Sequence, residues 1–369
     1  MVKLETLRGM AAMPKGYLVL ENGDVFAGQL LGNKYPIAGE AVFNTSMNGY
    51  QEIITDPSYA GQILTLTYPT IGNYGCGEYG FEAEAPALRG LVVKEISELN
   101  GHYESKWNFS EFLEKFGITC LTGVDTRALT RTLRLKGSMG AIITASLDQP
   151  ERLIAAAHKG KELLDTDLVK QVSCSRPQVY GEGEKTVILF DFGTKRNIIR
   201  SLVKMGIRVI AVPAETSAEA IMAYHPDGLV LSNGPGNPEC CDYAVREIRK
   251  LLPVLPMFGI CLGHQLLALA LGAETYKLTF GHRGGNHTVR DMKTGKCMVT
   301  SQNHGYAVDD GSLQAEEVMI RFRNLNDNTV EGLAHQHLPL LSVQFHPEAS
   351  PGPQDSAYLF DEFLTLIGN

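Results

Sequence analysis

The stretch from Val254 to Leu271 reads VLPMFGICLGHQLLALAL and decides the fold of the second half of the chain. The apolar run Val254–Ile260 predicts a buried strand, and the apolar residues after Cys261 predict a helix that starts at once. Gly259 and Gly263 lie two residues on either side of the cysteine. This spacing is the thiol counterpart of the G-x-S-x-G elbow, where glycines permit a sharp turn from strand to helix. The segment therefore predicts a cysteine nucleophile at the rim of an α/β sheet.

The predicted elbow places the sulfur of Cys261 at a helix N-terminus, where the partial positive charge favours the thiolate. The N–H of Leu262 is then positioned to donate to an oxyanion. A lone cysteine at a strand end is more often a small, inert core residue. The paired glycines and the switch from strand to helix favour the nucleophile over that alternative.

Further apolar runs in the second half of the chain predict more strands of the same sheet. Lys185–Phe190 and Ile207–Val212 predict strands, and Asn197–Met205 between them has the spacing of an amphipathic helix. Such a βαβ unit implies parallel strands, and Gly228–Leu231 and Leu340–Phe345 supply more of them. We predict an α/β fold whose C-terminal domain is doubly wound, with a mostly parallel sheet.

The chain has 369 residues, which is too long for one ordinary domain. Residues 173–184 are rich in Pro, Gly, Ser and charge and predict a linker between an N-terminal domain at 1–172 and a C-terminal domain at 185–369. Asn22-Gly23 between two short apolar runs predicts a β-hairpin in the first domain, and two short helices are expected at 109–116 and 127–135. That domain is therefore mixed α+β, with residues 1–13 as a loose extension.

Composition narrows the class of protein. The apolar share is 44% and the charged share 20%, as in globular proteins. A net charge of −8, with acidic and basic residues interspersed, argues against a nucleic-acid partner. The sequence contains no run of ~20 apolar residues, so we predict no membrane span. The N-terminus lacks the features of a signal peptide. Seven cysteines without a CxxC pair indicate a reducing compartment, and we expect a cytoplasmic protein with neither a disulfide framework nor a metal site.

A candidate base lies near the C-terminus. The predicted strand 340–345 leads directly into His346-Pro347-Glu348. A histidine at a strand's carboxyl end lies at the same rim of the sheet as Cys261, and Glu348 can hold its ring in one tautomer. Alone, this segment would more often be a surface turn. Together with the elbow it predicts a Cys–His–Glu triad.

Several motifs carry a family resemblance. GICLGHQ (259–265), FHPE (345–348) and LSNGPGNP (231–238) resemble the class I glutamine amidotransferases. VFNTSMNGYQEIITDPSY (42–59), TLTYPTIGNYG (65–75) and GVDTRALTRTLR (123–134) resemble the small chain of carbamoyl-phosphate synthase in particular, as do DFGTKRNIIRSL (191–202), GHRGGNH (281–287) and SQNHGYAVD (301–309). The resemblance covers the chain from about residue 15 to its end.

The resemblance implies roles for individual residues. Cys261 would be the nucleophile, completed by His346 and Glu348, and no residue would bind a metal. Tyr306 departs from the phenylalanine that is common in the family at that position. The implied contacts with L-glutamine are Ser58, Gly234, Gly236, Leu262, Gln265, Asn303, Gly305 and Tyr306.

The resemblance also implies a glutamine-hydrolysing subunit that releases ammonia through a thioester and passes it to a large subunit. That partner would make carbamoyl phosphate from bicarbonate, ammonia and two ATP with Mg²⁺, so this chain would need no cofactor. No G-x-x-x-x-G-K-[ST] loop is present, and Asp191–Arg196 is only superficially like a phosphate loop. The alternatives are an amidotransferase subunit of another synthase, a non-catalytic regulatory subunit and a free-standing hydrolase. The sequence is compatible with a supply of carbamoyl phosphate to either arginine or pyrimidine synthesis.

Overall fold

The computed structural model describes residues 13–32, 35–313 and 317–368, and the chain forms two compact units. The first unit takes the chain up to Phe43 together with Gln62–Glu78 and Arg89–Glu162. The second takes Asn44–Gly61, Tyr79–Leu88 and the chain from Leu163 onward. Two segments of the first 88 residues thus fold with the second half. The predicted linker at 173–184 stays a prediction, and residues 1–12 of the predicted extension lie outside the described residues.

The first unit is built on a closed barrel with the strand order β1-β2-β8-β6-β4-β3-β9. The predicted hairpin is confirmed, because β1 and β2 pair antiparallel with Leu18 opposite Phe26. The helices expected at 109–116 and 127–135 are present as α2 and α3. The elements of this unit are β1 (Lys15–Leu20), β2 (Val25–Leu31), β3 (Ile37–Asn44), β4 (Gln62–Leu66), β5 (Thr70–Ile71), β6 (Gly90–Val92), β7 (Glu95–Ile96), α2 (Phe109–Lys115), β8 (Cys120–Thr122), α3 (Thr126–Lys136), β9 (Met139–Thr144) and α4 (Pro150–Glu162).

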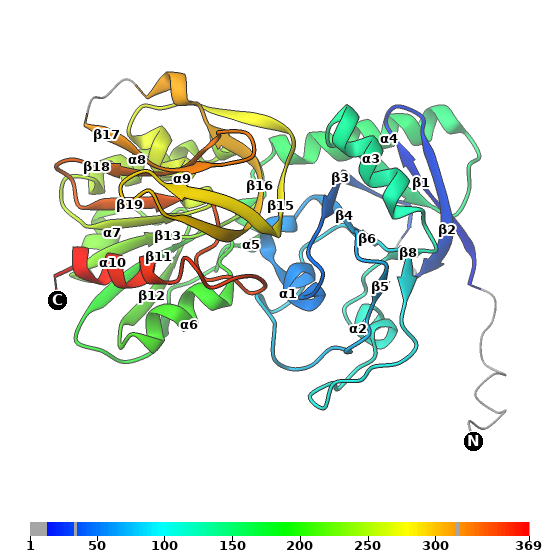
Figure 1. Cartoon of the computed structure of the whole chain (residues 1–369), viewed down its shortest axis with the longest axis horizontal. Helices are drawn as coiled ribbons and strands as arrows, with labels where there is room; N and C mark the ends of the chain where they lie inside the picture. The colour runs from blue at the N-terminus through cyan, green and yellow to red at the C-terminus, as the bar shows by residue number, and fades with distance from the viewer. Residues whose placement is uncertain (1–12, 33–34, 314–316, 369) are drawn as a thin grey trace. The chain divides into compact units, whose positions relative to one another are not determined.

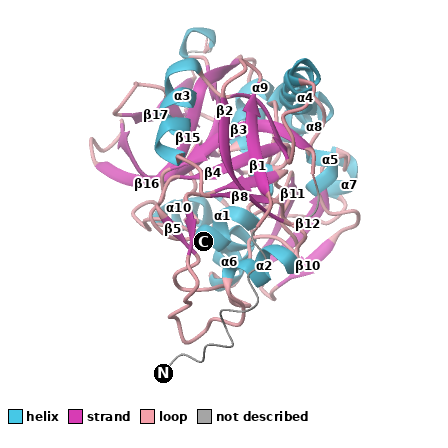
Figure 2. Cartoon of the chain, turned by 90° about the vertical axis from the view of Figure 1, so that its right-hand side faces the viewer, coloured by secondary structure: helices cyan, strands magenta, loops and turns pink. Residues whose placement is uncertain are grey.

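Helix α4 covers one side of this barrel. Its Ala157 is fully buried in a cluster with Val19 of β1 and Ile142 of β9, and Figure 2 shows the barrel strands in magenta with α4 beside them. Gly160 lies where the helix crosses β3, and a Cβ there would come 2.5 Å from the backbone nitrogen of Gly39. The close approach of helix and strand therefore requires glycine at that position.

The second unit contains a ten-stranded sheet in the order β10-β12-β11-β13-β14-β19-β18-β17-β15-β16. Its centre, from β12 to β19, is parallel, as predicted. The sheet continues through antiparallel strands from β18 to β16, and β10 pairs antiparallel at the other edge. The strands are β10 (Gln178–Tyr180), β11 (Thr186–Asp191), β12 (Arg208–Pro213), β13 (Gly228–Leu231), β14 (Met257–Ile260), β15 (Thr275–Asp291), β16 (Cys297–Val308), β17 (Val318–Asn324), β18 (Val330–His335) and β19 (Leu340–Val343).

Helices cover both faces of the parallel centre, as Figure 1 shows for α8 and α9 on one side and α6 and α10 on the other. The side chains of β11 alternate between two cores: Ile188 packs with α7, α8 and α9, whereas Val187 and Leu189 pack with α6 and α10. This double covering explains why the central strands read as continuous apolar runs. The helices of the unit are α1 (Tyr50–Thr55), α5 (Val169–Val172), α6 (Arg196–Lys204), α7 (Ala218–Met222), α8 (Asp242–Leu251), α9 (Leu262–Ala270) and α10 (Tyr358–Leu366), with short 3-10 helices at Pro57–Tyr59, Leu163–Asp165, Pro238–Cys241 and Asp310–Ser312.

Two predicted strands are longer than the observed ones. The strand expected at 254–260 begins at Met257, because the N–H groups of Val254 and Leu255 both bond to Leu251 at the end of α8. Pro256 also lacks a donor for a sheet ladder. The strand expected at 340–345 ends at Val343, where the chain turns toward His346. None of the helices in the described part of the chain is long and apolar enough to cross a membrane.

Candidate active site

The turn between β14 and α9 is a strained elbow. Cys261 has φ 54° and ψ −105°, a conformation that a non-glycine residue seldom adopts. A Cβ on Gly263 would lie 2.2 Å from the oxygen of Leu231, and one on Gly259 would lie 2.9 Å from the oxygen of Gly263. Both glycines are therefore needed for the backbones to approach, and the predicted elbow is present.

The sulfur of Cys261 lies among polar groups although the residue is only 2% exposed. Its thiol is 3.6 Å from the carbonyl oxygen of Asn303, and it accepts from Nε2 of Gln344 at 3.8 Å. Leu262 is the first residue of α9, so its N–H has no acceptor within the helix. That donor, the helix N-terminus and the sulfur together form the arrangement expected for an acyl-transfer nucleophile.

The loop after β13 lies against the elbow. Gly234 is packed so closely that a Cβ would be 2.3 Å from the oxygen of Phe192 and 2.7 Å from Cδ2 of Leu262. Gly236 has φ +87°, where side chains are disfavoured. The structure thus places Gly234 beside the elbow.

His346 and Glu348 form the second part of the site. Nδ1 of His346 and Oε1 of Glu348 are 2.6 Å apart, and both residues are buried. The backbone N–H of His346 donates to the oxygen of Ser301 on β16 at 2.8 Å, which fixes the histidine against that strand. Its Nε2 atom is buried and has no hydrogen-bond partner among the described residues. One ring nitrogen is therefore anchored and the other is available.

A buried lysine completes this group. Nζ of Lys195 is 3.0 Å from the same Oε1 of Glu348, and Lys195 also donates to the oxygen of Ala349. Burial disfavours the carboxylate, yet Lys195 and His346 hold the pKa of Glu348 below its ordinary value. Burial likewise opposes protonation of His346, but Glu348 and Cys261 raise its pKa above the ordinary range. The site thus favours an ionised carboxylate beside a readily protonated imidazole.

Ser58 and Asn303 meet the site through the segment 44–61, which belongs to the same compact unit. Oγ of Ser58 accepts from Nδ2 of Asn233 at 2.9 Å. Asp56 accepts from the N–H of Ser58 through Oδ1 and from Nδ2 of Asn303 through Oδ2, both at 2.9 Å. Asn233 in turn accepts from the N–H of Lys195 at 2.9 Å. Asp56 therefore ties Ser58 to the strand that faces the cysteine.

Gln265 lies one turn after Cys261 on α9. Its Nε2 donates to the oxygen of Tyr306 at 2.9 Å and to Oε1 of Gln344 at 3.0 Å. Tyr306 is tied to the site through its backbone, consistent with a position that tolerates Tyr in place of Phe. Gly305 is the residue before it, and a Cβ there would lie 3.3 Å from Nη2 of Arg283. A cavity of about 20 Å³ is lined in part by Asp56, Lys195, Asn303 and His346, which places these four residues together.

Sequence reasoning missed four members of this site: Asp56, Lys195, Asn233 and Gln344. Lys195 lies within Asp191–Arg196, whose superficial likeness to a phosphate loop pointed to the wrong chemistry. Asn233 lies inside the LSNGPGNP motif, and Gln344 lies two residues before His346, so both carried a positional signal. Asp56 is separated from its partner Asn303 by 247 residues, and no local pattern could join them.

Two family models match two separate parts of the chain. Residues 188–366 match the family "Glutamine amidotransferase class-I", and residues 18–143 match "Carbamoyl-phosphate synthase small chain, CPSase domain". A carbamoyl phosphate synthase small chain from Syntrophotalea carbinolica is 48% identical, with 96% of this chain and 98% of that protein covered. The chain belongs to the carbamoyl-phosphate synthase small-chain family. The arginine-specific small chain of Bacillus subtilis is 49% identical over 96% of this chain and 97% of that one.

Membership in this family confirms the resemblance read from the motifs and the predicted fold class. The second match begins within the first barrel strand β1 and ends in β9, so it covers the barrel of the first unit. Other class I amidotransferase families are therefore a poorer description of the whole chain. The assignments of individual residues stay predictions.

Proposed function

We propose that this chain is the glutaminase subunit of a carbamoyl-phosphate synthase. Two observations together carry the proposal. Cys261 has a positive φ at the elbow, and His346, which pairs with Glu348, is fixed against β16. The match of residues 18–143 to the small-chain domain supports this synthase over other amidotransferases. The complete triad supports a catalytic rather than a purely regulatory subunit.

The first half of the proposed reaction is acyl transfer to sulfur. The Cys261 thiolate attacks the side-chain carbonyl carbon of L-glutamine, and a C–S bond forms while negative charge develops on the oxygen. The N–H groups of Leu262 and Gly236 would donate to that oxyanion. His346 then gives the proton on Nε2 to the amide nitrogen, the C–N bond breaks and ammonia leaves.

The second half is hydrolysis of the thioester. His346 takes a proton from water, the hydroxide adds to the acyl carbon, and the C–S bond breaks to release glutamate. Glu348 keeps Nδ1–H pointing toward itself, so that Nε2 is the nitrogen that exchanges protons. Ser58, Gly234, Gln265, Asn303, Gly305 and Tyr306 would bind the glutamine.

The ammonia requires a partner. We propose a heterodimer with the large subunit of the synthase, which would use ATP, Mg²⁺ and bicarbonate, while glutamine hydrolysis in this chain needs no cofactor. No nucleic acid or membrane takes part, and the setting is the cytoplasm. The similarity to the arginine-specific chain of Bacillus subtilis supports a role in arginine synthesis.

The test compares Cys261→Ser with Cys297→Ser, an exposed cysteine as the matched control. In the complex with the large subunit, Cys261→Ser should lose glutamine-dependent synthesis and keep synthesis from added ammonia. Cys297→Ser should keep both. If Cys261→Ser retains more than a few per cent of glutaminase activity, the proposed mechanism is wrong.

A further inference from the structure

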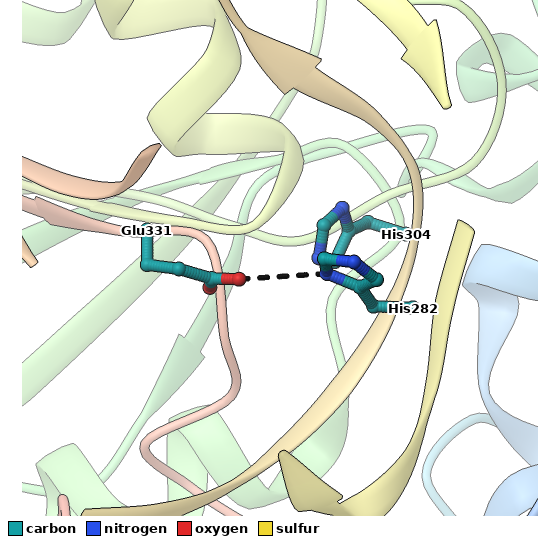
Figure 3. A group of neighbouring side chains, drawn as sticks. All are labelled: His282, His304 and Glu331. Atoms are coloured by element: carbon teal, nitrogen blue, oxygen red, sulfur yellow. Dashed lines mark ion pairs between the residues drawn. The ribbon is translucent and has the colours of Figure 1, made fainter. Parts of the chain in front are cut away.

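A second buried group of ionisable side chains lies behind the strand that faces Cys261. His282 of β15, His304 of β16 and Glu331 of β18 point toward one another, as Figure 3 shows. All three are buried. Nδ1 of His282 is 3.5 Å from Oε1 of Glu331, and its Nε2 is 2.7 Å from Oδ2 of Asp327. The imidazole of His282 therefore lies between two carboxylates.

From Glu331, hydrogen bonds lead along β16. Its Oε2 accepts from Nε2 of Gln302 at 3.0 Å, and Oε1 of Gln302 is 3.2 Å from Nε2 of His304. Nδ1 of His304 is 2.8 Å from the oxygen of Tyr306. That same oxygen accepts from Gln265, which brings the chain of contacts to the residue one helical turn after Cys261.

The backbone ladder of this region is interrupted at two places. The pairing of β15 with β16 is irregular on both sides of the stretch from His282 to Gly284, where the register shifts. Interrupted ladders place fewer backbone hydrogen bonds on the strand, and bulges of this kind re-aim side chains near active sites. Asn303 lies within this stretch, opposite Arg283, and it carries the carbonyl next to the sulfur. Between the two irregularities, side-chain contacts add to the three ladder pairs that hold this part of β16.

The same three residues have the composition of a metal site. Nδ1 of His282 has no hydrogen-bond partner among the described residues, but the other donor atoms of the group face protein partners. Oε1 of Glu331 accepts from Nδ2 of Asn324 at 2.9 Å, and both ring nitrogens of His304 face carbonyl oxygens. A protonated His282 between Glu331 and Asp327 balances the buried charge without an ion. The contacts favour a hydrogen-bonded support over a metal site.

We propose that His282 is a positioning residue for glutamine binding, held by Asp327 and acting through Glu331 and Gln302 on the Asn303–Tyr306 stretch of β16. The inference rests on the proposed function, because that stretch would line the glutamine pocket. Without the positive charge of His282 beside it, the Glu331 carboxylate would attract other hydrogen-bond donors and displace Gln302. The displacement moves Asn303 and Tyr306 but leaves the elbow of Cys261 and the His346–Glu348 pair, which other contacts hold.

The decisive variant is Asp327→Asn, a nearly isosteric change at a side chain that is 40% exposed. It should raise the glutamine KM roughly 3- to 30-fold through loss of one charge-assisted hydrogen bond, with a smaller effect on kcat. The matched control is Asp310→Asn, which removes an exposed carboxylate paired with Arg323 of the same sheet. This control should leave KM unchanged.

Two further measurements separate positioning from general damage. The rate of Cys261 alkylation by iodoacetamide without glutamine should stay at the parent value in Asp327→Asn, and the melting temperature should stay close to it. The glutamine concentration that half-protects Cys261 should rise by the same factor as KM. His282→Gln should show the same pattern, and adding Asp327→Asn to it should change KM little further, because the two residues act as one unit.

An unchanged KM in both variants would overturn the proposal. So would a rise in KM that is accompanied by faster alkylation and a lower melting temperature, since that pattern indicates loosened packing. Stoichiometric zinc in the purified chain that disappears in His282→Gln would also overturn it, because the group would then be a metal site. The parent chain and Cys261→Ser, assayed in parallel, show separately whether the proposed glutaminase function holds.

Discussion

Two buried histidines in this protein sit beside carboxylates in different ways. His346 touches one carboxylate, Glu348, whose charge is also balanced by Lys195, and its Nε2 has no hydrogen-bond partner among the described residues. His282 lies between two carboxylates: its Nε2 bonds to Asp327, and its Nδ1, although it makes no hydrogen bond among the described residues, lies 3.5 Å from Oε1 of Glu331. The difference lies in where the second nitrogen points.

That difference separates a residue that can exchange protons from one that can only hold a position. A general base needs one ring nitrogen free to meet the substrate, and a partner on the other nitrogen to fix the tautomer. His346 satisfies both conditions. His282 satisfies only the second, because each of its ring nitrogens faces a carboxylate of the protein. Substitutions at the two residues should therefore have different kinetic signatures.

The largest expected effect is that of His346→Asn. Loss of proton transfer should lower kcat for glutamine hydrolysis by ~10²–10⁴-fold, while His282→Gln should act mainly on KM. Steady-state kinetics of both purified variants would measure this. Similar losses of kcat in the two variants would contradict the different roles assigned to His346 and His282.

Lys195→Met should have the next largest effect, on stability. It leaves the Glu348 carboxylate buried without its cation, which typically costs about 3–5 kcal/mol. Urea denaturation should show that loss, and the double variant Lys195→Met/Glu348→Gln should be more stable than Lys195→Met alone. If the double variant is the less stable of the two, Glu348 is not the group that Lys195 balances.

Glu348→Gln should be milder than His346→Asn. It keeps the shape of the side chain but loses one charge-assisted hydrogen bond, which corresponds to roughly a 10- to 100-fold loss of kcat/KM. The assay must be made on folded protein, judged by circular dichroism. A loss equal to or greater than that of His346→Asn would contradict the assigned roles.

The smallest expected effect concerns pH. Burial disfavours protonated His282, yet the hydrogen bond to Asp327 and the nearby Glu331 carboxylate raise its pKa to about 9 from an ordinary 6.5. A raised pKa in the folded state stabilises the fold below pH 6.5, and that contribution is lost as pH rises through 9. The difference in unfolding free energy between the parent and His282→Gln should shrink by on the order of 1 kcal/mol from pH 7 to 8. A difference that stays constant or grows would show that His282 is not the titrating group.

The sequence predicted those parts of the site that local patterns encode. The elbow followed from Gly259, Cys261 and Gly263 with the switch in apolar spacing, and His346 with Glu348 followed from a strand end. Lys195 and Asp56 lie inside the motifs 191–202 and 42–59, but those motifs assigned them no role, and their partners lie far away along the chain. The folding of segment 44–61 with the second half of the chain likewise depends on long-range contacts, such as that of Ser58 with Asn233.

The His282 group could not be predicted for a further reason. His282, Gln302 and Glu331 come from three different strands, and their meeting depends on the register of β15 with β16 and on the antiparallel extension of the sheet. A mostly parallel sheet was predicted, and its parallel centre is present, but sequence periodicity does not show in which order the last strands add. Register shifts within β15 obscure the alternation further.

The most direct test of the central claim is covalent labelling of Cys261 by a glutamine analogue that carries a diazomethyl ketone in place of the side-chain amide. We predict one label per chain on the peptide that contains Cys261, loss of glutaminase activity in proportion to labelling, and protection by glutamine. Labelling should be slow in His346→Asn and close to the parent rate at saturating analogue in His282→Gln. Full labelling at another residue, or glutaminase activity that survives complete labelling of Cys261, would contradict the account.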